Sequence, residues 1–139
     1  MGPLDLRAAP PRSPRAELAG VIFLPRSIDK ARATLAGGDI GLYSIPGLTE
    51  MMLETFGISL PEFVEAVRSA ATDDDVAAFV TGRAAPEAIE RWNGFVRDRP
   101  AAGGDAAVAR ERYPWLPESG AVPPVLDVLE EDDRRSFVS

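Results

Sequence analysis

The chain has 139 residues, with 22 acidic and 15 basic side chains, and it contains neither cysteine nor histidine. These absences exclude disulfides, thiolate nucleophiles, imidazole bases and the zinc or haem sites that depend on such ligands. A net charge of −7 also disfavours a nucleic-acid partner, because phosphate repels an acidic chain whose basic groups do not gather on one face.

Residues 1–18 are predicted to form a proline-rich arm ahead of a single helical domain over residues 19–139, whose C-terminal end is acidic. Four prolines fall between residues 3 and 18. Proline fixes φ and lacks an amide proton, so the arm is expected to be extended. The next segment, "GVIFLP" at 20–25, predicts a short strand that Pro25 ends.

The first predicted helix follows, with Ser27 as its N-cap and Gly37-Gly38 at its end. Residues 39–46, "DIGLYSIP", fit either a second short strand or a loop with inward side chains. In the first case the two strands flank the helix as a small β-α-β-like unit.

From residue 47 onward, the apolar spacing predicts helices almost throughout. The segment "SLPE" at 59–62 is a capping box that opens one of them. "TDDD" at 72–75 opens the next, because acidic residues complement the positive end of a helix. A magnesium site is the weaker alternative there, since three consecutive Asp side chains point in three directions. Asp105 is a further N-cap, of a short Ala-rich helix.

The fold class that follows is mainly α: a single compact domain of about six or seven short helices, with room for a small two-stranded element near the N-terminus. The sequence contains no run of about eighteen apolar residues, the length that a membrane-spanning helix needs. The first twenty residues also lack the apolar stretch of a signal peptide. We therefore expect a cytoplasmic protein with no membrane partner, no bound metal and no cofactor.

One stretch concentrates charge on the first predicted helix, "LPRSIDKARA" at 24–33, and it holds Lys30, the only lysine of the chain. Helical spacing turns Lys30 away from the apolar face, so the simplest interpretation is a solvated face on which Asp29 and Arg32 pair at i, i+3. The alternative is that other elements cover this face. A lysine desolvated beside a second cation such as Arg26 can act as a base or as a Schiff-base nucleophile.

Several segments resemble a small bacterial family catalogued as domain-of-unknown-function family 5069. The likeness is most specific at "PPRSPR" (10–15) and at "LPRSIDKARA" (24–33), and it continues through Tyr43 and "FGI" at 56–58. A helix containing Trp92 and a final "D…DD…SF" extend it over most of the chain. The family name implies no activity.

This sequence departs from that family at one place. Family members often have a Cys-Pro-Leu-Asp stretch after the tyrosine, and here the region reads Ile45-Pro46-Gly47-Leu48. If the family has a chemical site that uses the cysteine or the aspartate, this chain has lost or replaced it.

The resemblance gives weight to the "PPRSPR" segment, which packing alone does not explain. Proline-stiffened arginines could fold over the first helix and bring Arg12 and Arg15 near Arg26 and Lys30. Such a cluster suits a carboxylate or phosphate held by arginine forks. Trp92 is included as a substrate-stacking candidate, although its place on an apolar face favours the core.

The first functional hypothesis is thus a small-molecule enzyme or binding protein that acts on an anionic metabolite. In an enzyme, proton-transfer chemistry of the isomerase, cyclase or lyase type would use Lys30 or Asp29 as the base and Tyr43 as the acid. The second hypothesis is non-enzymatic: a helical interaction module that docks a protein through its basic front or through the acidic segment 130–139. Oligomeric state is not predicted.

Overall fold

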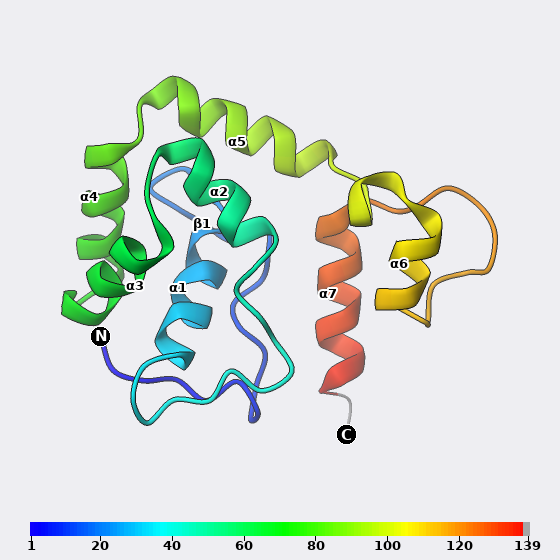
Figure 1. Ribbon diagram of the computed structural model, residues 1–139, viewed down its shortest axis with the longest axis horizontal. Helices are drawn as coiled ribbons and strands as arrows, with labels where there is room; N and C mark the ends of the chain where they lie inside the picture. Colours follow the sequence, from blue (N-terminus) through cyan, green and yellow to red (C-terminus); the bar gives the residue numbers. More distant parts are fainter. Residues whose placement is uncertain (138–139) are drawn as a thin grey trace. The chain divides into compact units, whose positions relative to one another are not determined.

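A computed structural model describes residues 1–137 and divides the chain into two compact units, Met1–Asn93 and Gly94–Ser139. The described residues form seven α-helices, one 3-10 helix and one two-stranded antiparallel sheet (Figure 1). The predicted mainly α class, the number of helices and the small two-stranded element are therefore confirmed. Within the described range, no helix has both the length and the apolar character needed to cross a membrane.

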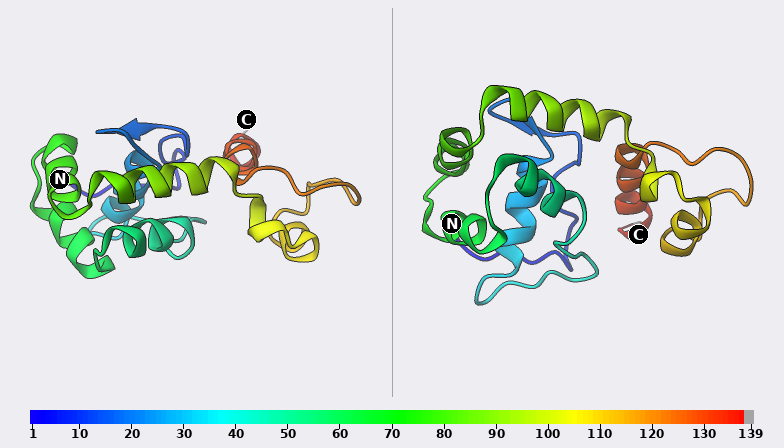
Figure 2. Two further views of the ribbon diagram at one scale, coloured as in Figure 1. Left: turned by 90° about the horizontal axis from the view of Figure 1, so that it is seen from above. Right: turned by 45° about the horizontal axis from the view of Figure 1, so that its top comes forward.

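The first unit contains most of the regular structure. Its elements are β1 (Glu17–Leu18), β2 (Val21–Ile22), α1 (Leu24–Ala33), α2 (Leu48–Phe56), α3 (Leu60–Ser69), α4 (Asp73–Arg83) and the first part of α5 (Pro86–Asp98). The unit closes around buried apolar side chains of α1, α2, α3, α4 and α5, among them Ile28, Met52, Phe63, Val76 and Trp92. Figure 2 shows α1 from two further directions inside this unit.

The strands differ from the predicted pair. β1 and β2 form one hairpin with Leu18 opposite Val21, so of the two alternatives for residues 39–46 the second strand, and with it the β-α-β-like unit, is wrong. Residues 39–46 contribute only an isolated parallel bridge, between Asp39 and Asp5 of the arm. The hairpin turn holds Ala19 and Gly20 at φ 51° and 76°, as a tight two-residue turn with left-handed central residues requires. The sequence "AG" is a weak signal for such a turn, because alanine rarely adopts positive φ.

The first helix begins earlier than predicted. α1 starts at Leu24, and Ser27 lies inside it, where its amide donates to the Phe23 carbonyl at 3.0 Å. Pro25 belongs to the first helical turn, a position that tolerates proline because its missing amide proton has no helical partner there. The helix also ends earlier, at Ala33, and the Thr34 amide turns back to the Ala31 carbonyl at 3.1 Å.

Local capping signals later in the unit were predicted correctly. Ser59 is the N-cap of α3, and its hydroxyl accepts a hydrogen bond from the Glu62 amide at 3.2 Å. A capping box opens α4, in which the Asp75 carboxylate accepts from the amides of Ala71 and Thr72. These backbone hydrogen bonds lower the pKa of Asp75.

The second unit is smaller and is described to residue 137. After the last part of α5 it contains η1 (Ala101–Gly104), α6 (Ala106–Arg112) and α7 (Val125–Ser136). Asp105 caps α6 as predicted, accepting from the Val108 amide at 3.1 Å. The core of the unit is built from small residues of η1 and α6 packed with Leu116 and Val128.

Candidate functional site

The polar face of α1 is covered, contrary to what helical spacing alone indicates. Every residue from 21 to 31 is buried. Arg26 is 1% exposed, Asp29 5% and Lys30 9%. Of the two interpretations open from the sequence, a solvated face or a face covered by other elements, the structure supports the second.

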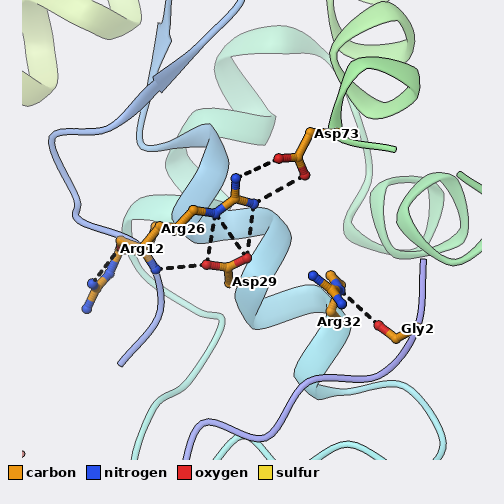
Figure 3. Close-up of polar contacts among 6 residues, drawn as sticks. All are labelled: Gly2, Arg12, Arg26, Asp29, Arg32 and Asp73. Carbon is orange, nitrogen blue, oxygen red and sulfur yellow. Dashed lines mark hydrogen bonds and ion pairs between the residues drawn. The ribbon is translucent and has the colours of Figure 1, made fainter. Parts of the chain in front are cut away.

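The arm supplies much of this cover, through Arg12. Its guanidinium meets the Asp29 carboxylate with Nε–Oδ2 at 3.1 Å and Nη2–Oδ1 at 3.0 Å, and its backbone amide donates to Asp29 Oδ2 at 2.8 Å (Figure 3). The same guanidinium donates to both carboxylate oxygens of Asp73 on α4, at 2.6 and 3.2 Å. Hydrogen bonds to Asp73, and then to Asp29, raise the pKa of Arg12 against the opposing effect of burial. One side chain thus joins the arm, α1 and α4.

Arg26 is held by the same arm segment. Its Nη1 donates to the backbone carbonyl of Arg12 at 3.2 Å (Figure 3). Its guanidinium carbon lies 6.0 Å from the ring centroid of Phe23 and 5.4 Å from that of Tyr43. Both distances are within the range of cation–π attraction.

Lys30 lies one helical turn further on, against the same two rings. Its Nζ is 5.7 Å from the centroid of Phe23 and 6.0 Å from that of Tyr43. Two cations, at i and i+4 of one helix, therefore share two aromatic side chains. We call Phe23, Arg26, Lys30 and Tyr43 the cation–aromatic cluster.

Tyr43 reaches this cluster from the segment that joins α1 to α2. The turn that carries it is closed by a hydrogen bond from the Tyr43 amide to the Ile40 carbonyl at 3.1 Å. Gly41 within it has φ 62°, and a side chain there would meet the Leu6 carbonyl at 3.1 Å. Glycine thus permits a close approach of this loop to the arm. The neighbouring Leu42 is 97% exposed.

The structure therefore brings together five of the seven predicted site residues. These are Arg12, Arg26, Asp29, Lys30 and Tyr43, linked by the contacts given above. Arg15 is exposed, and its amide donates to the Ser13 hydroxyl at 3.1 Å. Trp92 is 1% exposed and lies in the core, where its Nε1 donates to the Ile22 carbonyl at 2.8 Å. The centroid of its ring lies 6.5 Å from that of Phe23 in an edge-to-face arrangement, so Trp92 packs against one of the aromatic side chains of the cluster.

Two residues of this region were not predicted from the sequence. Phe23 was assigned to a strand, whereas it precedes α1 with φ 79°, and nothing in "GVIFLP" signals that conformation. Asp73 was interpreted as a helix N-terminal acid, with a magnesium site as the weaker alternative, and not as a partner of Arg12. The signal that could have identified it is the triple Asp itself, because one capping carboxylate suffices and Asp75 already provides it.

Asp29 has less freedom than the role of a general base requires. Both of its oxygens accept hydrogen bonds from Arg12. A carboxylate so occupied is poorly placed to take a proton from a substrate. The geometry favours Asp29 as the residue that fixes the arm instead of as a base.

The acidic segment 130–139 lies mostly on α7, and residues 138–139 are outside the described range. Glu131 pairs with Arg134 and with Arg135 one turn along the helix. The hydrogen bond from Arg134 is the main cause that lowers the pKa of Glu131 to about 2. Part of the negative charge in this segment is thus balanced locally.

Comparison with known protein families identifies the family of this chain. Residues 8–135 match a family described as domain of unknown function (DUF5069). The chain belongs to this family. The matched range contains the arm from residue 8, the cation–aromatic cluster, and both carboxylates that hold Arg12, so all these features lie inside the family domain. A search of curated proteins found no match.

Proposed function

We propose that this DUF5069 protein binds a small anionic metabolite, a carboxylate or a phosphate, at the polar face of α1. Arg26 and Lys30 would supply the positive charge and Tyr43 a phenol donor. The observation that carries the proposal is the pair of cations on consecutive turns of one buried helix face, both against the ring of Tyr43.

The energetics of burial support a functional role for these cations. Removing a cation from water costs free energy that its contacts within the protein must offset. Apolar residues at the same helical positions would often pack at lower cost. Coulomb attraction to an anion is stronger in such a poorly hydrated environment than at an exposed surface.

If the protein is an enzyme, its chemistry would be cofactor-independent proton transfer of the isomerase, cyclase or lyase type. Lys30 and Tyr43 would be the proton-transfer groups, because Asp29 is occupied by Arg12. Arg26 would hold the anionic group of the substrate. Arg12 would act on the substrate only indirectly, since its guanidinium is shared between two carboxylates.

The test is ligand-induced thermal stabilisation with a panel of small carboxylates and phosphates. We expect at least one anion to raise the melting temperature of the natural protein, and we expect the Lys30→Met variant to lose that rise while it melts near the natural temperature. Methionine replaces the buried stem of lysine with similar volume, so the fold should survive. Arg32→Gln on the same helix is the control, and it should keep the response.

Two outcomes would contradict the proposal. One is a panel in which no anion stabilises the natural protein. The other is a Lys30→Met variant that responds to the anion as the natural protein does. Arg26→Gln is a second probe, and a variant that melts early without any change in the anion response would assign Arg26 to the fold alone.

One observation favours the alternative function, a protein-interaction module. Leu42 is 97% exposed beside Tyr43, and a partner that covered it would remove apolar surface from water, which is favourable. Under this alternative, Leu42→Ser would abolish capture of a specific partner in pull-downs. Under the metabolite proposal, the same variant would leave the anion response unchanged.

A further inference from the structure

Arm residues 10–15, "PPRSPR", are here called the strap. Pro11 and Pro14 are buried, so the strap packs on the first unit instead of extending into solvent. Arg12 at its centre is held through its amide, its guanidinium and its carbonyl, by Asp29, Asp73 and Arg26. Arg12 thus ties the strap to α1 and α4 at the strap's midpoint.

The two carboxylates that hold Arg12 differ in their surroundings. The Asp29 side chain is 7% exposed, whereas that of Asp73 is 31% exposed and that of Arg12 40%. Ion pairs near the surface are weakened by water and salt. The contact to Asp73 is therefore the one that solvent and competing ions reach first, while the contact to Asp29 is shielded.

Arg26 depends on the position of the strap. It is 1% exposed, and the strap's Arg12 carbonyl accepts one of its hydrogen bonds. With the strap in place, an anion from solvent has little access to this guanidinium. Displacement of the strap would expose Arg26 and release one of its donors for a ligand.

We propose that the strap gates the anion site and that Asp73 is the positioning residue that holds it closed through Arg12. The inference rests on the proposed function for what the strap guards, but the motion of the strap can be measured without any ligand. An anion binds only the open form, so its apparent affinity is reduced by the fraction of molecules that are open. Loss of the Asp73 contact increases that fraction.

The first experiment measures strap opening in the free protein. The Arg12 amide is bonded to Asp29 at 2.8 Å, so its hydrogen-exchange rate reports how often the strap opens. We expect Asp73→Asn to speed this exchange about fivefold, the equivalent of about 1 kcal/mol for a partly exposed ion pair. Asp74→Asn is the matched control. It removes the same charge from the same helical turn, and Asp74 makes no hydrogen bond or ion pair with other described residues.

The second experiment titrates each protein with inorganic phosphate and follows the ring signals of Tyr43 by NMR. The chain has two tyrosines, which simplifies their assignment. We expect Asp73→Asn to bind phosphate more tightly than the natural protein, by up to about fivefold. The Asp74→Asn control should bind with the natural affinity.

The outcomes separate the two claims. Equal Arg12 exchange in Asp73→Asn and Asp74→Asn overturns the role of Asp73. Faster exchange without tighter phosphate binding overturns the gate, because the strap then opens without exposing the site. A third outcome is that phosphate shifts the Tyr43 signals in none of the three proteins, while Asp73→Asn still speeds exchange of the Arg12 amide. That result overturns both the anion site and the gate. The contact of Asp73 with Arg12 would then only hold the strap in place.

Discussion

Two acids of this protein, Asp29 on α1 and Glu131 on α7, form ion pairs of opposite kinds. On α7, Glu131 pairs with arginines three and four positions along the same helix, and those arginines are exposed. On α1, Asp29 pairs with Arg12, seventeen positions earlier in the chain, and the acid is buried. The first pattern can be derived from helical spacing alone, whereas the second depends on which segments fold over the helix. Burial is therefore what distinguishes an ion pair that joins distant segments from one that forms along a single exposed helix face.

The largest effect expected from this contrast is that of Asp29→Ala. Removal of the Asp29 carboxylate leaves the Arg12 guanidinium without its shielded partner and the Arg12 amide without its acceptor. Loss of one member of a buried, hydrogen-bonded pair should lower the free energy of unfolding by about 2–3 kcal/mol. Denaturant unfolding measures this change. Glu131→Ala on α7 is the matched variant, and it should lower the free energy of unfolding by much less, because solvent screens an exposed ion pair. A similar loss in both variants would contradict the distinction.

The effect of Arg12→Gln should be somewhat smaller. Glutamine keeps the side chain polar but cannot donate to two carboxylates at once. We expect a loss of about 1–2 kcal/mol, because the Arg12 side chain is 40% exposed and solvent replaces part of what is removed. A double-mutant cycle with Asp29→Ala should give a coupling free energy of similar size. Simple additivity of the two changes would mean that the contact contributes nothing to stability.

The smallest effect is expected on α7 and depends on pH. The folded pKa of Glu131 is about 2, below the ordinary value of 4.5. A lowered pKa means that the stabilisation from Glu131 is complete above about pH 4.5 and is lost as the pH falls toward 2. As the pH falls from 4.5 to 2, the melting temperature of Glu131→Gln should therefore decrease slightly less than that of the natural protein. Near neutral pH, the difference in melting temperature between this variant and the natural protein should not change with pH.

Sequence reasoning predicted the features that are local. The mainly α class, the cap at Ser59 and the cap at Asp105 follow from residues that interact within one turn. The hairpin was missed because its turn uses Ala19 at positive φ, where the sequence carries no strong signal. The start of α1 was missed because Pro25 can equally end a strand or occupy a first helical turn.

The candidate site was predictable only in part, for a related reason. The cluster of charges in "LPRSIDKARA" and the arginines of "PPRSPR" could be found by inspection. The contact of Arg12 with Asp73 on α4 could not, because it joins residues sixty-one positions apart. Burial of Lys30 likewise depends on the loop that carries Tyr43, whose path is set by tertiary packing.

The central claim is that the cation–aromatic cluster binds an anion, and Lys30 allows a direct test. As the only lysine, it gives a single side-chain amine signal after reductive methylation with a carbon-13 label, a change that keeps its charge. The claim predicts that this signal shifts in a saturable way when a stabilising carboxylate or phosphate is added, and that sodium chloride at equal ionic strength produces no such shift. A signal that responds to added chloride as it does to every anion of the panel would show that Lys30 lies outside any anion site.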